Sequence, residues 1–305
     1  MTFNSRQICS LVDRYSVEIT PAGAARIGSF ANHLPAGTTV NVTFLPGSDI
    51  AGTVSVCRRL RAEGFNPVPH LAARSLTGRS QLERALDELV THAAVTEVLV
   101  IAGGIDRPLG PFPSSMELLE TGLLERRGIR TVGVAGHPEG SPDIPAPELA
   151  RALARKNAWA RDTGLDVYIE TQFCFDADTV AAWERRLRAD GNRLPIRVGV
   201  PGPATVKTLL RFAQVSGVGP SMLFLTRQAR SVTRLLSQQQ PDRFVARLAE
   251  LVAADPDSLV RGLHFYPFGG LAKTAEWVNA VSAGAFRPDG ENGFTVLGQA
   301  LPAAS

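Results

Sequence analysis

The sequence YIETQFCFD, residues 168–176, decides the fold. Its aromatic and β-branched residues predict a buried strand, and Asp176 closes that strand. The amide side chain of Gln172 then falls where the strand meets its loop. A helical pattern follows over residues 179–189, so this stretch is one strand–helix unit of an alternating α/β fold.

The same alternation extends over most of the chain. Apolar strand-like runs are predicted at 16–20, 40–45, 66–72, 97–102, 131–135, 166–173, 196–200 and 259–265. Helices with apolar residues at three- and four-residue spacing are predicted at 54–63, 81–92, 116–127, 147–162, 179–189 and 205–214. About eight such units favour a (β/α)8 TIM barrel. The alternative is an open doubly wound sheet, which usually has fewer strands.

One unit is irregular. Between residues 219 and 258 the chain has an apolar run at 222–226 and helical patterns at 231–239 and 242–253, which predict an extra helical excursion before the last strand. We expect one domain over residues 1–305, with a short N-terminal extension at 1–14 and a loosely held tail at 285–305. The excursion is left open as a lid or as a contact in a homo-oligomer.

Composition excludes several classes of protein. The 305 residues are 44% hydrophobic and 20% charged, with a formal net charge of +3 and the basic residues spread along the chain. This argues against a nucleic-acid partner. The three cysteines show no paired spacing, no His/Cys/Asp cluster suggests a metal, and no apolar run approaches the ~20 residues of a membrane span. We expect a cytoplasmic protein.

In a (β/α)8 barrel the working residues project from the C-terminal ends of the strands. Glu18 lies between Val17 and Ile19 in the first strand, so its side chain points into the barrel if theirs point outward. A buried carboxylate must be hydrogen-bonded or functional because burying it unpaired is costly. The alternatives are a structural pair with an arginine and a general acid whose pKa is raised by apolar surroundings.

Other polar side chains fall at the ends of further predicted strands, where they would converge on one mouth. They are His70, Asp106, His137, Glu139, Gln172, His264 and Tyr266. Each has a structural alternative: a histidine can be a satisfied core residue, and Asp106 can cap the turn Gly103-Gly104-Ile105-Asp106. Together they favour a ligand site.

These segments, in this order, resemble methylenetetrahydrofolate reductase. The resemblance rests on SVEITP at 16–21, PHL at 69–71, AGGID at 102–106, AGHPEG at 135–140, YIETQFCFD at 168–176 and GLHFY at 262–266. It implies a flavin-containing (β/α)8 barrel. Such an enzyme reduces 5,10-methylenetetrahydrofolate to 5-methyltetrahydrofolate with hydride from NAD(P)H.

The resemblance also implies roles for particular residues. Glu18 and Asp106 correspond to catalytic carboxylates, of which Glu18 helps to protonate the folate as its five-membered ring opens. Substrate binding falls to Gln172, Asp106, Phe175 and Tyr266. Cofactor binding falls to His70, Gly104, His137, Glu139 and Lys156.

This chain departs from the family pattern at the expected flavin anchors. The arginine of the family's Arg-Gly-Asp turn is replaced by Gly103 or Gly104, and the basic residues of 154–161 are out of register. Fewer charge-assisted bonds should weaken the binding of a diphosphate. We therefore expect FAD from the family but with weakened anchors, which leaves direct hydride transfer from the nicotinamide open.

Two other functions stay open. A folate-dependent one-carbon or methyl transferase would keep Asp106 and Gln172 but need no nicotinamide. A non-catalytic folate-binding barrel would bind folate without turnover.

Overall fold

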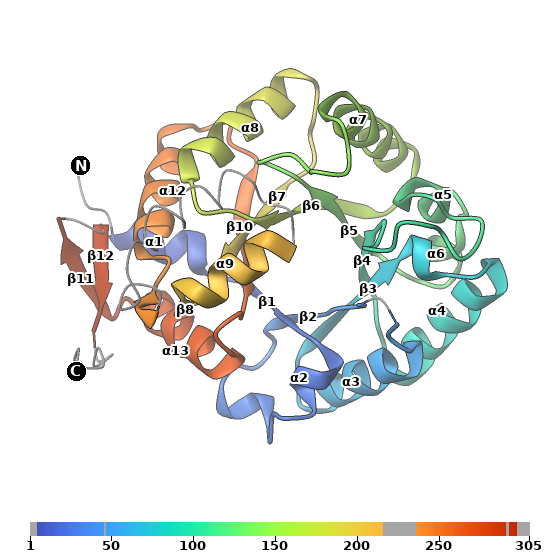
Figure 1. Cartoon of the computed structure of the whole chain (residues 1–305), viewed down its shortest axis with the longest axis horizontal. Helices are drawn as coiled ribbons and strands as arrows, with labels where there is room; N and C mark the ends of the chain where they lie inside the picture. Colours follow the sequence, from blue (N-terminus) through green and yellow to red (C-terminus); the bar gives the residue numbers. More distant parts are fainter. Residues whose placement is uncertain (1–4, 46, 216–235, 291–292, 298–305) are drawn as a thin grey trace.

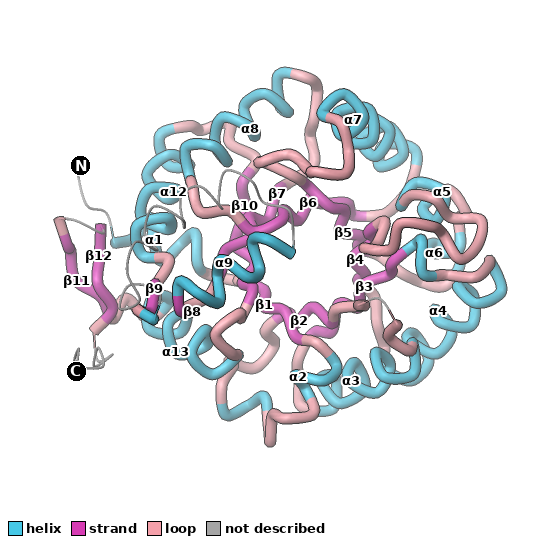
Figure 2. Tube along the Cα trace, in the orientation of Figure 1, coloured by secondary structure: helices cyan, strands magenta, loops and turns pink. Residues whose placement is uncertain are grey.

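The computed structural model describes residues 5–45, 47–215, 236–290 and 293–297. In this part of the chain, parallel strands close into a barrel in the order β1-β10-β7-β6-β5-β4-β3-β2 (Figure 2). The barrel strands are β1 Ser16–Ile19, β2 Thr39–Val42, β3 Asn66–Ala72, β4 Glu97–Ile101, β5 Thr131–Gly136, β6 Asp166–Phe173, β7 Ile196–Pro201 and β10 Val260–Tyr266. This confirms the predicted (β/α)8 barrel.

Helices surround the barrel on its outer side, except α9, which crosses in front of the strands (Figure 1). In chain order they are α1 Ser5–Val12, α2 Pro21–Ala24, α3 Ile50–Ala62, α4 Arg79–Ala93, α5 Ser115–Leu119, α6 Leu123–Arg126, α7 Ala146–Asp162, α8 Ala177–Ala189, α9 Val206–Val215, α12 Asp242–Ala254 and α13 Leu271–Ser282. Short 3-10 turns lie at Phe30–Asn32 and Ala73–Ser75. Side-chain caps start several of these helices; Asp49, for example, accepts a hydrogen bond from the backbone N–H of Ala51 at 3.2 Å.

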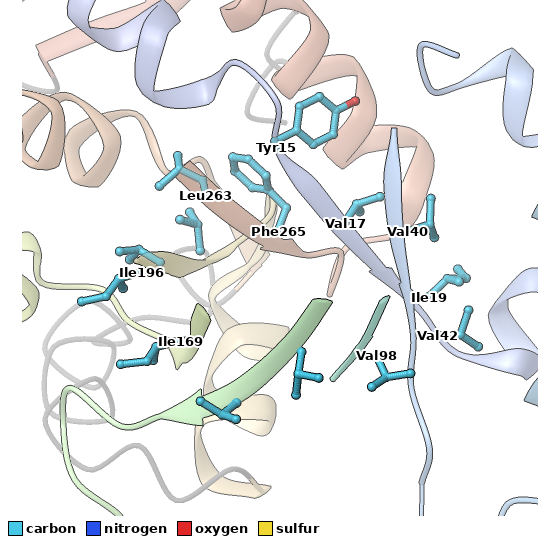
Figure 3. Packing of buried hydrophobic residues seen from close by; sticks show 14 of the residues in the cluster. Tyr15, Val17, Ile19, Val40, Val42, Val98, Ile169, Ile196, Leu263 and Phe265 are labelled. Carbon is cyan, nitrogen blue, oxygen red and sulfur yellow. The ribbon is translucent and has the colours of Figure 1, made fainter. Parts of the chain in front are cut away.

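Alternation along each strand decides which side chains enter the barrel. Val17 and Ile19 on β1 join Val40 and Val42 on β2 in the apolar core between the strands and the helices (Figure 3). Because successive side chains point to opposite faces, Glu18 must face the interior. The predicted inward direction of Glu18 follows from this packing.

Two helix predictions need correction. The predicted helix 116–127 is two short helices, because Thr121 and Gly122 form a turn in which Gly122 has a left-handed φ of 64°. The predicted helix 231–239 does not reach its end, since Gln238–Gln239 form strand β9. Residues 231–235 and the apolar run 222–226 lie outside the described residues.

The excursion before the last strand carries the chain over the barrel. Strand β8, Ala204–Thr205, pairs antiparallel with β9, and α9 follows β8 directly. Figure 1 shows α9 crossing in front of the strands, whereas α12 takes the position of a barrel helix. Part of the predicted excursion, residues 219–235, lies outside the described residues.

The expectation of a loosely held tail is corrected for part of 285–305. Strands β11, Phe286–Asp289, and β12, Gly293–Val296, pair antiparallel at the end of the described chain. Phe294 is fully buried, and its ring lies 4.8 Å from that of Phe286 and 6.0 Å from that of Trp277. These aromatic contacts fix the hairpin against α13. Among the described residues, no helix is both long and apolar enough to cross a membrane.

Candidate active site

Glu18 lies inside the barrel beside Asn41. The two residues are register partners in the parallel pair of β1 and β2, so their side chains share the interior face. Asn41 is fully buried, while Glu18 keeps some exposure at the open mouth. Burial among the surrounding strands raises the pKa of Glu18 to about 8. Glu18 can therefore keep its proton at neutral pH.

A second carboxyl, Glu170 on β6, is buried across the barrel from Asn41. The Asn41 amide donates a hydrogen bond from Nδ2 to Glu170 Oε1 at 2.7 Å. Only 3% of Glu170 is exposed, and burial is the main cause that raises its pKa to about 8. The sequence interpretation assigned no role to Glu170.

His264 on β10 completes the group around Glu170. Its Nδ1 lies 2.8 Å from Ser16 Oγ and 3.4 Å from Glu170 Oε2. Burial holds the pKa of His264 well below its usual range, so the ring is neutral. Its Nε2 has no hydrogen-bond partner among the described residues, and neither has Nε2 of His70 on β3. Both imidazoles are buried, and burial lowers the pKa of His70 to about 4.

Gln172 lies at an irregularity in β6. The register between β6 and β7 shifts between Glu170 and Phe173, which is where a β-bulge re-aims a side chain. Gln172 is partly exposed, and its Oε1 accepts a hydrogen bond from the backbone N–H of Phe173 at 3.1 Å. Within the described part of the chain its Nε2 has no hydrogen-bond partner and can face a ligand. The predicted amide at the strand end is in place.

Aromatic side chains form one wall of the mouth. Tyr266 donates a hydrogen bond to the carbonyl oxygen of Thr171 at 3.0 Å, and its ring lies 5.5 Å from that of Phe173. Phe268 stacks 4.0 Å from Phe212 of α9. Phe175 meets Phe173 edge to face at 6.0 Å. Two of the predicted substrate residues, Phe175 and Tyr266, thus belong to one aromatic cluster with α9.

The opposite end of the barrel is closed by a charged pair. Arg197 on β7 donates from Nη1 to Glu97 Oε1 on β4 at 2.9 Å, and its guanidinium lies 4.0 Å from the centre of the Tyr168 ring. Gly133 on β5 leaves room for that ring, because a Cβ there would lie 2.7 Å from the Tyr168 oxygen. These residues fill the barrel at the N-terminal ends of the strands. The ligand site is therefore confined to the C-terminal mouth.

The end of β5 carries the predicted cofactor residues His137, Glu139 and Lys156. Lys156 is buried on α7, and burial lowers its pKa to about 8. Burial, and then the charge of Lys156, lowers the pKa of His137 to about 4. Glu139 is partly exposed on the same loop.

Asp106 and Gly104 lie on the exposed loop after β4. Arg74 holds that loop, donating to the carbonyl oxygens of Ile105 and Pro113 at 3.4 Å and 2.8 Å. Asp106 has no hydrogen-bond partner among the described residues. The structure thus brings Glu18 and Tyr266 together in the barrel and places Asp106 on its rim.

Sequence reasoning missed the polar residues deeper in the barrel: Asn41, Glu97, Glu170 and Arg197. A signal was present for Glu170, because it lies two residues after Tyr168 and two residues before Gln172 in the predicted strand. In a regular strand this spacing places the three side chains on the same face. The cross-barrel pairings of Asn41 and Arg197 join strands that are not neighbours, so strand alternation alone could not find them. Within the described ranges, no group of three or more His, Cys, Asp or Glu side chains could hold a metal ion.

A closed (β/α)8 barrel with an acid, an amide and an aromatic wall at its C-terminal mouth belongs to the class of barrels that bind small molecules there. The family described as Methylenetetrahydrofolate reductase matches residues 24–276. The chain belongs to this family.

Individual relatives are distant. Methylenetetrahydrofolate reductase 1 of Schizosaccharomyces pombe is 39% identical over 88 residues, which are 28% of this chain and 14% of that protein. A solved structure from Clostridium thermocellum, described as an uncharacterized protein that binds two copies of 5-methyl-5,6,7,8-tetrahydrofolic acid, superposes with a TM-score of 0.57. It covers 88% of this chain and 94% of its own at 10% identity, which shows a shared fold.

Proposed function

We propose that this protein reduces 5,10-methylenetetrahydrofolate to 5-methyltetrahydrofolate with hydride taken from NAD(P)H. The observation that supports this most is Glu18: a carboxyl inside the barrel mouth whose pKa is raised to about 8 by burial. A general acid works best when its pKa is near the working pH. Membership of the family supplies the substrate class.

The proposed chemistry needs one proton and one hydride. Glu18 gives its proton to N10 as the C–N bond between N10 and the methylene carbon breaks, which leaves an iminium at N5. The nicotinamide then delivers hydride to the methylene carbon, and the iminium becomes the N5-methyl group. NAD(P)H and one proton are consumed, NAD(P)+ is formed, and Glu18 is reprotonated from solvent.

The neighbouring residues would orient the folate. Gln172 can hydrogen-bond the pterin through its free Nε2, and Tyr266 and Phe175 offer aromatic surface beside it. Asp106 lies on the rim of the barrel, and it would contact the folate once the folate occupies the mouth. In this proposal Asp106 tunes charge near the pterin.

The residues of α7 do not fit a tightly held FAD. Lys156 is buried with lowered basicity, Arg155 pairs with Glu120 at 2.8 Å, and Arg151 and Arg161 line a groove between α7 and the end of α8. A flavin diphosphate would meet one buried lysine there instead of a cluster of cations. A nicotinamide nucleotide binds and dissociates in each turnover, so it needs fewer charged contacts than a tightly bound FAD. We therefore propose direct hydride transfer from NAD(P)H to the folate.

The test is an absorbance spectrum of the purified protein followed by NADH and NADPH oxidation with methylenetetrahydrofolate, with and without added FAD. We expect a colourless protein that oxidises the nicotinamide only when folate is present. A yellow protein, or turnover that requires FAD, would contradict direct transfer. Folate binding without turnover would favour the binding barrel, and one-carbon transfer without nicotinamide would favour the transferase.

A further inference from the structure

A long stretch of the sequence before α12 contains no acidic residue. The chain has 29 aspartates and glutamates in 305 residues, yet none falls between residues 191 and 241. The basic residues of this stretch are Arg193, Arg197, Lys207, Arg211, Arg227, Arg230 and Arg234; the last three lie outside the described residues and are not part of the proposed site. A segment whose charges are all positive attracts ligands of negative charge.

Helix α9 presents two of these charges to solvent. Val206, Leu209 and Ala213 are buried on one side of the helix, whereas Lys207 and Arg211 are exposed. Residues four positions apart are neighbours on a helix surface, so the two cationic side chains lie on the same face. Together they form a small positive patch one helical turn long.

This positive patch has no structural counter-charge in the described part of the chain. Neither Lys207 nor Arg211 forms an ion pair with a described residue, and α9 itself contains no acid. Exposed arginines on other helices do have partners: Arg79 pairs with Glu83 one turn along α4 at 3.3 Å, for example. An ion pair that fastens α9 to the barrel therefore does not explain the two charges.

The buried side of α9 joins the helix to the candidate site. Phe212 of α9 stacks on Phe268 with ring centres 4.0 Å apart, and the Phe268 ring lies 4.9 Å from that of Phe173. The same aromatic cluster contains Phe175 and Tyr266, the proposed folate contacts. Since α9 crosses in front of the strands in Figure 1, its positive patch lies at the edge of the mouth beside the aromatic wall.

We propose that Lys207 and Arg211 bind the carboxylates of the folate's glutamate tail, and that they favour a tail of several γ-linked glutamates. The proposal rests on the proposed function, which places the pterin in the barrel mouth. The pterin and the glutamate are at opposite ends of a folate, so a pterin inside the mouth leaves the glutamate outside it. Each further γ-linked glutamate adds one carboxylate, and a row of carboxylates complements two cations one turn apart.

The phosphates of the nicotinamide nucleotide are the other anions that the proposed reaction brings to the mouth. The position of α9 favours the folate tail, because the helix packs in the cluster of Phe175 and Tyr266. The predicted cofactor residues His137 and Lys156 lie elsewhere, after β5 and on α7.

The test compares the binding of 5-methyltetrahydrofolate with one glutamate and with three glutamates, by titration calorimetry without nicotinamide. Each exposed ion pair adds a factor of about 1.5–5 to an affinity, so wild type should bind the triglutamate roughly 3–10-fold more tightly. The double variant Lys207→Gln/Arg211→Gln should lose this preference and keep its affinity for the monoglutamate within about 2-fold. High salt should reduce the wild-type preference, because mobile ions screen exposed charges.

The matched control is the double variant Arg58→Gln/Arg84→Gln. Both arginines are exposed, on α3 and α4, and the double substitution changes the net charge by the same amount. The control should keep the wild-type preference for the triglutamate. A preference that is as strong in K207Q/R211Q as in this control would overturn the proposal.

Two further outcomes would also overturn it. One is equal affinity of the wild type for the two folates, which leaves the proposed function intact if the monoglutamate still binds. The other is a loss of NADH or NADPH affinity in K207Q/R211Q with an unchanged tail preference, which would assign the two charges to the nucleotide. A wild type that binds neither folate would overturn the proposed function itself.

Discussion

Gly199 on β7 fits against Thr171 on β6 with no room for a side chain. The backbone N–H of Gly199 donates to Thr171 Oγ1 at 2.8 Å, and a Cβ at position 199 would lie 2.5 Å from the Thr171 carbonyl oxygen. The same carbonyl accepts the hydrogen bond from Tyr266. The bulge that re-aims Gln172 therefore depends on a glycine in the neighbouring strand.

Gly199→Ala should destabilise the barrel and weaken folate binding together. A methyl group forced into this contact costs about 1–3 kcal/mol and pushes Thr171 and Tyr266 out of position. Denaturant unfolding and folate titration would measure both effects. Gly262→Ala on β10 is the matched control, since a Cβ there meets nothing within 4 Å. Equal stability and equal folate affinity in the two variants would contradict this account of the bulge.

The barrel could be predicted from the sequence because each strand carries its own apolar pattern. The predicted strand 66–72 has the observed bounds of β3, and 166–173 those of β6. The hairpin β11–β12 could not be predicted in the same way. Its apolar residues are few, and its stability comes from the contact of Phe294 with Trp277, far away in sequence.

In the candidate site, too, some residues follow from local sequence patterns and others depend on contacts between distant segments. Glu18 and Gln172 follow from strand alternation and strand ends, which are local features of the sequence. The buried residues Asn41 and Glu170, by contrast, meet across the barrel, and their contact depends on how strands that are not neighbours close into a ring. Strand ends therefore predict the position of an acid, while its proton affinity depends on closure.

Glu97→Gln should unfold at lower denaturant concentration. It would leave Arg197 without its carboxylate partner at the N-terminal end of the barrel. Removing one partner of a fully buried pair costs roughly 3–5 kcal/mol, and we expect about 2–3 here because 28% of the Arg197 side chain is exposed. Glu120→Gln, which breaks the half-exposed pair with Arg155, should cost less than about 1 kcal/mol. Similar losses of stability in both variants would show that the pair of Glu97 and Arg197 stabilises the protein no more than a half-exposed pair does.

Asp242→Asn should stabilise the protein at pH 8. Burial raises the pKa of Asp242 from 3.8 to about 6, so the folded state holds this proton more tightly than the unfolded state. Its contribution to stability is then greatest below pH ~4 and is lost as the pH rises to about 6, a cost of about 2–3 kcal/mol above that pH. Asparagine removes the charge but can still accept the hydrogen bond from Trp277 Nε1, which is 2.7 Å long in the structure.

The pH dependence distinguishes this effect from simple repacking. The gain of Asp242→Asn should disappear in unfolding experiments at pH 4, where the wild-type carboxyl is protonated. Asp166→Asn, at an exposed position at the start of β6, should show no gain at either pH. A gain that is equal at pH 4 and pH 8 would count against a buried charge as the cause.

Glu18→Gln should abolish folate reduction and leave the fold intact. Glutamine has nearly the same shape but no proton to give, and loss of a general acid costs about 10²–10⁴-fold in rate.

In the wild type the form with a protonated Glu18 is the active one, and burial raises the pKa of Glu18 to about 8. Activity should therefore persist across neutral pH and fall as the pH rises above about 8. An acid with the ordinary pKa of 4.5 would already have lost its proton at neutral pH, so its activity would fall at a much lower pH. Steady-state NADH oxidation between pH 6 and 10 measures this limb. Glu148→Gln, an exposed change in the first turn of α7, should keep the wild-type profile. If E18Q turned over folate at the wild-type rate, Glu18 would not be the acid.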